Sequence, residues 1–162
     1  MMGIKTVLVA ISAILLIAGI ATGVFIWSDR PTSVSLRPYD AKTVAMGKRI
    51  YTETCASCHG INLKGQPNWT DRNSEGKLPA PPHDESGHTW HHGDRVLFDL
   101  TKFGTAKFIG GDYKSDMLPF EGVLSDEEII AVLSYIKSTW PKEMQKRHDL
   151  LNESLRQQEA QK

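Results

Sequence analysis

Cysteine is scarce in this chain. The 162 residues contain only two cysteines, and both fall in residues 54–60, TCASCHG. A structural zinc site usually takes four ligands from two such cysteine pairs, and there is no second pair. A dithiol oxidoreductase carries its C-x-x-C pair in a βαβ unit, and the sequence has no convincing strand pattern. The sequence therefore lacks the additional ligands of a zinc site and the βαβ unit of a dithiol oxidoreductase.

An excess of either charge is also absent. Lys and Arg number 19, and Asp and Glu also number 19, which gives a formal net charge of zero. Nucleic-acid-binding proteins usually carry an excess of basic residues. The charge balance therefore indicates no nucleic acid as a partner, and the sequence shows no internal repeat that would indicate a solenoid.

One long hydrophobic run is present near the N-terminus. Residues 6–27 contain no charged side chain over 22 positions, and as a helix they span about 33 Å against a hydrocarbon core of about 30 Å. A cleaved signal peptide is the alternative, since Lys5 precedes the run and Gly19 and Ala21 are small residues before a possible cut. Because the run is longer than the roughly 7–15 residues of the apolar region in a signal peptide, we expect residues 1–27 to form a transmembrane anchor.

The rest of the chain predicts an all-α domain at residues 40–140 between two polar segments. Residues 28–39 carry two prolines and three serines and are expected to be an extended linker. Asp40 is expected to cap a helix over 41–54, and a second helix is expected over 95–104 with Asp94 as its cap. Ser125 and Glu128 form an S-x-x-E capping box before a third helix, which ends near Pro141. Residues 141–162 are expected to be a solvated helical extension with an apolar stripe at Leu150, Leu151 and Leu155.

Cys55, Cys58 and His59 form a C-x-x-C-H motif, which offers a different explanation for the two cysteines. Two thiols three positions apart can form thioethers with the two vinyl groups of one haem, and the adjacent imidazole can then ligate the iron. Such haem attachment takes place outside the bacterial inner membrane, where the expected anchor puts this domain. The sequence therefore predicts one covalently bound haem c.

Two stretches, GKRIYTETCASCHG and DMLPFEGVLSDEEIIAVLSYI, together resemble class I cytochrome c. Gly47 and Tyr51 match the Gly-x-x-x-aromatic pattern of that family's first helix, and Tyr135 matches the aromatic position of the last helix that packs against it. The small Gly47 would permit a close helix crossing. The resemblance covers about residues 40–140 and implies a cytochrome c-like, single-haem domain that transfers electrons.

The resemblance also implies a second iron ligand and a partner for the first. Met117 lies 58 residues after His59, where the family keeps its axial methionine, although Leu118 here separates Met117 from Pro119. A thioether ligand favours Fe(II) and raises the potential. Pro67 resembles the family's loop proline, whose carbonyl accepts the ring proton of His59.

Other polar residues lie in the long Pro- and Gly-rich loop over 61–93. Trp90 is expected to line the haem edge and to hydrogen-bond the haem propionates. One of four loop histidines could instead ligate the iron, and three of them could hold copper or zinc at His88, His91 and His92; the fourth is His83. Residues 71–76, DRNSEG, imitate half of a calcium loop but are expected to be a polar turn.

The resemblance and the anchor together imply a membrane-anchored electron carrier rather than an enzyme. We expect it to lie in the bacterial inner membrane with a single pass and the haem domain in the periplasm. Its partners would be the lipid bilayer and membrane redox complexes, with a cytochrome bc1-type donor and a terminal oxidase or reaction centre as acceptor. The alternatives are a fixed haem c subunit of a terminal oxidase or dehydrogenase complex, and a haem sensor with an open iron.

Overall fold

The computed structural model describes residues 34–161, and these residues form helices and loops without a strand, which confirms the all-α class for this part of the chain. The expected anchor at 1–27 and the first part of the linker lie outside the described residues. No helix within 34–161 is long and apolar enough to cross a bilayer. The longer helices are α2 (Ala41–Ile50), α4 (Asp94–Phe103), α6 (Asp126–Ser138) and α7 (Lys142–Ala160).

The first helix begins where its cap predicts and runs directly into the cysteine motif. The Asp40 carboxylate accepts a hydrogen bond from the Thr43 backbone N–H at 2.6 Å. After α2 the chain widens into a π-helical turn, Tyr51–Cys55, and then tightens into α3, Ala56–His59. Wide turns of this kind within a helix are frequent at functional sites. The helix therefore extends past the expected residue 54 and delivers both cysteines and His59 on consecutive turns.

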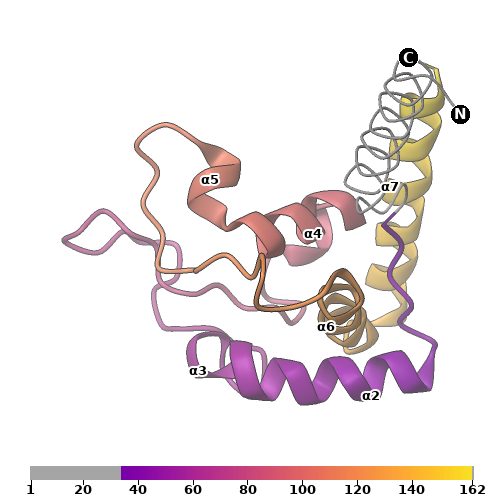
Figure 1. Ribbon diagram of the computed structural model, residues 1–162, viewed down its shortest axis with the longest axis horizontal. Helices are drawn as coiled ribbons and strands as arrows, with labels where there is room; N and C mark the ends of the chain where they lie inside the picture. Colours follow the sequence, from indigo (N-terminus) through magenta and orange to yellow (C-terminus); the bar gives the residue numbers. More distant parts are fainter. Residues whose placement is uncertain (1–33, 162) are drawn as a thin grey trace, which may run out of the picture. The chain divides into compact units, whose positions relative to one another are not determined.

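Helices α2 and α6 cross in close contact and form the centre of the core (Figure 1). The Ser125–Glu128 capping box is present at the start of α6, as predicted. The predicted stripe of α6 is buried, at Ile129, Val132, Leu133 and Ile136. Gly47 lies against the backbone of Ala131, and the Tyr51 and Tyr135 rings meet with centroids 5.5 Å apart. The sequence-based expectation for this crossing is confirmed.

Helix α4 differs from its prediction at its start. Gly93 takes the N-cap position, and Asp94 is the first helical residue. Phe98 is buried on this helix, whereas Val96 is only partly covered. The Asp94 side chain therefore does not cap its own helix and is free for the long-range contacts described next.

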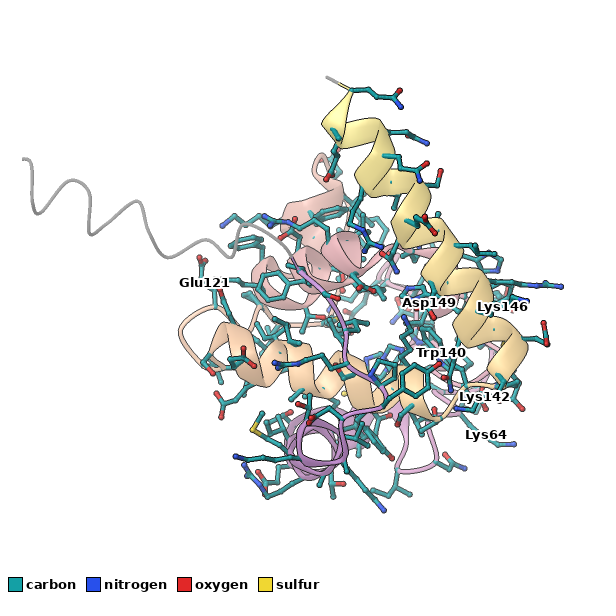
Figure 2. All side chains as sticks on the ribbon, turned by 90° about the vertical axis from the view of Figure 1, so that its right-hand side faces the viewer. Lys64, Glu121, Trp140, Lys142, Lys146 and Asp149 are labelled. Carbon is teal, nitrogen blue, oxygen red and sulfur yellow. The ribbon has the colours of Figure 1, made fainter. Side chains whose placement is uncertain are left out.

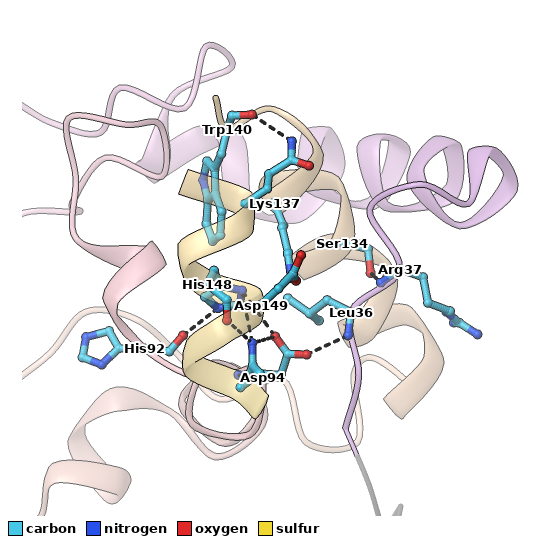
Figure 3. Close-up of polar contacts among 11 residues, drawn as sticks. Leu36, Arg37, His92, Asp94, Ser134, Lys137, Trp140, His148 and Asp149 are labelled. Atoms are coloured by element: carbon cyan, nitrogen blue, oxygen red, sulfur yellow. Dashed lines mark hydrogen bonds and ion pairs between the residues drawn. The ribbon is translucent and has the colours of Figure 1, made fainter. Parts of the chain in front are cut away.

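The two segments that flank the central domain are docked on it. In the segment expected to be a linker, Leu36 is buried and its N–H donates to Asp94 at 2.9 Å, and the Arg37 N–H donates to Ser134. Helix α7 donates to the other carboxylate oxygen of Asp94 through the Asn152 amide, at 3.0 Å (Figure 3). The described part of the linker is thus not a free tether, because a buried carboxylate joins it to α7.

Helix α7 (Figure 2) buries three polar side chains, while its leucines stay partly or largely exposed. Gln145, His148 and Asn152 are buried, whereas Leu150 and Leu155 are 57% and 36% exposed. His148 Nε2 donates to the His92 carbonyl at 2.8 Å. The extension is helical as expected, but it is docked and not merely solvated, since it makes these hydrogen bonds to α4 and the preceding loop.

Candidate functional site

His59 ends α3 with its imidazole buried and one ring nitrogen already engaged. Its Nδ1 donates to the backbone carbonyl of Pro81 at 2.9 Å, which leaves Nε2 with a free lone pair. Burial lowers the pKa of His59, while the Pro81 contact opposes that shift. A neutral ring with one nitrogen fixed and the other free is the form in which histidine binds a metal.

The carbonyl that meets His59 belongs to Pro81, so the expectation for Pro67 is corrected. Pro67 is exposed at the outgoing end of the long loop. The Gln66 N–H donates to the Ala80 carbonyl at 2.9 Å, and the Ala80 N–H donates back to Gln66 Oε1 at 2.8 Å. These two reciprocal hydrogen bonds close residues 67–79 into a side loop. The chain that follows this side loop brings Pro81 against His59.

The two cysteines are free thiols on neighbouring turns. Cys55 is half-buried and Cys58 is exposed, and neither is in a disulfide. Burial raises the pKa of the Cys55 thiol above its ordinary value. Each sulfur contacts the hydroxyl of the preceding residue, Thr54 at 3.3 Å and Ser57 at 3.9 Å, and neither is bonded covalently. Both are therefore available for covalent attachment to one group beside His59.

The sulfur of Met117 is held by a neighbouring hydroxyl. Thr105, the first residue of α5 (Thr105–Ile109), donates its Oγ1 hydrogen to Met117 Sδ at 3.4 Å. The Met117 N–H donates to Ser115 Oγ at 3.1 Å. These two contacts fix the methionine at its backbone and at its sulfur.

Leu118, the additional residue before Pro119, points outward. Its side chain is 75% exposed. Pro119 packs against Gly104, and the following N–H groups, of Phe120 and Glu121, donate to carbonyls at the end of α4. The loop therefore accommodates Leu118 at the surface, while the residues after Pro119 remain hydrogen-bonded to the end of α4.

Trp90 carries a buried donor that the described chain does not satisfy. Its indole Nε1–H is inaccessible to solvent and has no hydrogen-bond partner within residues 34–161. A buried unsatisfied donor costs about 1–3 kcal/mol. An acceptor from outside the chain, such as a carboxylate, would remove that cost, and this fits the expected contact with a haem propionate.

The loop histidines lie against aromatic rings, and the rings of His88 and His92 also meet edge-on with centroids 5.6 Å apart. His88 stacks on Trp69 with centroids 5.3 Å apart, and His91 stacks on Trp90 at 3.6 Å. No group of three His, Cys, Asp or Glu side chains within 34–161 is arranged to hold a metal ion, so the copper or zinc site considered for this loop is not formed there. The DRNSEG segment is a polar turn, since Asn73 Oδ1 accepts from the Glu75 and Lys77 N–H groups.

His83 is a site residue whose role the sequence did not indicate. Its ring stacks on the ring of His59 with centroids 4.1 Å apart and planes 23° apart. Burial lowers the pKa of His83 well below its ordinary value, and the adjacent His59 and His88 add to that shift. No local pattern pairs residues 24 positions apart inside a loop, so the contact emerges only from the folded chain.

The family model described as cytochrome c matches residues 44–140, more than half of the chain. The chain belongs to the cytochrome c family. Cytochromes of this kind carry covalently bound haem c, and the free Cys55 and Cys58, the free Nε2 of His59 and the unpaired indole of Trp90 fit that group. The cytochrome c domain indicates electron transfer as the activity.

Two known proteins are similar to this chain. Cytochrome cL of the marine methylotroph Methylophaga aminisulfidivorans MPT has a TM-score of 0.51 and 18% identity, covering 72% of this chain and 69% of its own; it supports the fold. A nitrite reductase of Stutzerimonas stutzeri is 27% identical over 130 residues, which is 76% of this chain. The chain spans only 21% of the length of that nitrite reductase.

Proposed function

We propose that this cytochrome c is an electron carrier whose haem iron is ligated by His59 and Met117. The observation that carries the proposal is the pair of fixed ligand atoms, with His59 Nδ1 donating to Pro81 and Met117 Sδ accepting from Thr105. When bound, the haem supplies one-electron chemistry between Fe(II) and Fe(III). Two protein ligands leave no open position for a substrate, which favours a carrier over an enzyme or a sensor.

The other site residues support the same role. Cys55 and Cys58 would hold the haem covalently, and Trp90 would donate its unpaired N–H to a propionate. A neutral thioether from Met117 stabilises Fe(II) relative to Fe(III) and raises the potential toward that of a donor to oxidases.

We further propose that residues 1–27 anchor the protein in the bacterial inner membrane with the haem domain in the periplasm. The support is the run of 22 uncharged residues after Lys5, which is long enough to span a bilayer. Anchoring of this kind would raise the effective concentration of the haem domain at redox partners in the same bilayer. This position suits electron exchange with a cytochrome bc1-type donor and a terminal oxidase or reaction centre as acceptor.

A redox titration of the full chain, purified with its haem in detergent, tests the carrier proposal. We expect a single reversible one-electron transition and no binding of carbon monoxide to the reduced protein. The variant Met117→Ala should bind carbon monoxide, because it opens the iron. Ready binding of carbon monoxide to the reduced wild type would instead support a sensor or ligand-binding protein and contradict the proposal.

A fixed haem c subunit of a larger oxidoreductase is the second candidate. The observation that favours it is the match of most of this chain to about a fifth of a nitrite reductase. Helix α7, outside the matched family region, presents Leu150 and Leu155 at its surface. Stable co-purification of the tagged full chain with a large redox complex, lost in Leu150→Glu, would support this candidate, and purification of the chain alone would support the carrier.

A further inference from the structure

The ring of His83 covers one face of the His59 ring. Its imidazole lies nearly parallel to that of His59, with centroids 4.1 Å apart and an angle of 23°. The hydrogen bond from His59 Nδ1 to Pro81 holds one edge of the ring and so limits rotation of the ring plane about the Cβ–Cγ bond. A flat group stacked on the face of the ring adds a second, independent restraint on its orientation.

The His83 ring is itself held on several sides. The His83 N–H donates to the Leu63 carbonyl at 2.7 Å, and the His83 carbonyl accepts from Trp140 Nε1 at 2.8 Å. Its Nδ1 is hydrogen-bonded to Thr89 Oγ1 at 2.8 Å, and the Tyr51 ring meets it edge-on at 6.4 Å. Backbone and ring are therefore both fixed, so His83 presents a rigid surface to His59.

We propose that His83 is a positioning residue that sets the orientation of the His59 imidazole plane on the haem iron. This inference rests on the proposed ligation by His59. The orientation of an axial imidazole determines which iron d orbitals its π system overlaps, and residues behind a metal ligand commonly control its orientation and electronic properties. An aliphatic side chain would fill the same space without a flat face to align the ring.

The test compares three variants of the holoprotein, His83→Leu, His83→Phe and Thr89→Val. Proton NMR of the ferric protein reports the order and spread of the haem ring-methyl shifts, and EPR reports the g values; both depend on the orientation of the imidazole plane. We expect His83→Leu to reorder the methyl shifts and broaden the EPR lines, and His83→Phe to restore a pattern close to the wild type. Thr89→Val removes the hydroxyl that bonds the His83 ring at 2.8 Å and the longer contact of that hydroxyl to the Pro82 carbonyl at 3.5 Å, but keeps the stacked ring, so it should give a smaller change in the same direction.

A merely structural role would lower the thermal stability of His83→Leu and leave both spectra unchanged, and that result would overturn the inference. Loss of the Met117 ligand resonance in His83→Leu, with Met117 present in the wild type, would also overturn it, because His83 would then act on the other side of the iron. Failure of the proposed function gives a different result: the wild type itself would lack the methionine resonance, while the His83 variants still change the methyl shifts through His59.

Discussion

Substituting Gly47 by alanine tests the close crossing of α2 and α6 on which the haem domain is built. A Cβ atom added to Gly47 would lie 1.9 Å from the carbonyl oxygen of Ala131 and 2.4 Å from its carbonyl carbon, whereas real Cβ atoms essentially never approach within 3.0 Å. The obstructing atoms belong to the backbone, so no side-chain rotation relieves the contact. The two helices would have to separate by roughly 1 Å in a close-packed core.

The size of the effect is a balance of two opposing terms. Alanine is better than glycine in a helix interior by about 1 kcal/mol, so propensity alone predicts stabilisation. Inserting a methyl group into a packed core costs about 1–3 kcal/mol and more where backbone must move. For Gly47→Ala we expect the second term to exceed the first by about 2 kcal/mol, which corresponds to a fall of roughly 6–8 °C in melting temperature for a chain of this length.

Thermal unfolding of the holoprotein, followed by far-UV circular dichroism, measures this loss. Gly76→Ala is the matched control, since Gly76 has φ of 79° and no atom within 4 Å of its added Cβ. That control should lose only about 1 kcal/mol, the cost of a left-handed alanine. If Gly47→Ala were as stable as the wild type or more stable, the proposed crossing would be wrong.

Three further changes have definite expected outcomes. Thr105→Val removes the hydrogen bond to Met117 Sδ, so the sulfur should donate more strongly to Fe(III) and the midpoint potential should fall by roughly 20–65 mV, the equivalent of one ordinary hydrogen bond. A redox titration measures this potential, and an unchanged or raised value would contradict the contact. Burial and the neighbouring Lys137 lower the pKa of His148, so the folded state favours the neutral ring, and stability should be highest above about pH 6.5 and fall as the pH decreases. His148→Gln should flatten that acid-side slope by up to about 1.4 kcal/mol per pH unit in urea unfolding, and an identical slope would refute the assignment. Trp90→Phe removes the unpaired indole donor, so the pH at which the midpoint potential responds to the propionates should rise; no change would place Trp90 away from them.

The features that local sequence predicted are those whose residues lie within one or two helical turns of each other. The Asp40 cap, the Ser125–Glu128 box and the spacing of Cys55, Cys58 and His59 each depend on contacts over a few residues. The α2–α6 crossing was also predicted, although it is long-range, because the resemblance to the family supplied it and Gly47 marked it. The presence of these helices was therefore predicted correctly. The π-helical turn was not predicted, because its amino-acid composition is that of an ordinary helix.

The features that were missed depend on where a long loop returns. The partner of His59 is Pro81 rather than Pro67, since the Gln66–Ala80 pair decides which proline comes back to the site. Prolines at either end of such a loop are equivalent in sequence. The stacking of His83 on His59 escaped prediction for the same reason.

The docking of α7 was missed because hydrophobic periodicity detects only apolar contacts. Asp94 and Asn152 are 58 positions apart and exchange hydrogen bonds through backbone and side chain, at 2.7 Å and 3.0 Å. Their polar composition resembles that of a solvated helix surface. Buried polar groups of this kind are recognisable only once their partners are known.

The central claim is that Met117 closes the iron that His59 holds, and one measurement tests it most directly. Oxidised cytochromes with a methionine axial ligand show a weak charge-transfer absorption band at the red end of the visible spectrum. We expect that band in the wild-type holoprotein and in the control variants Met46→Leu and Met144→Leu, and we expect its loss in Met117→Ala. A wild type without the band, or a Met117→Ala variant that keeps it, would contradict the account.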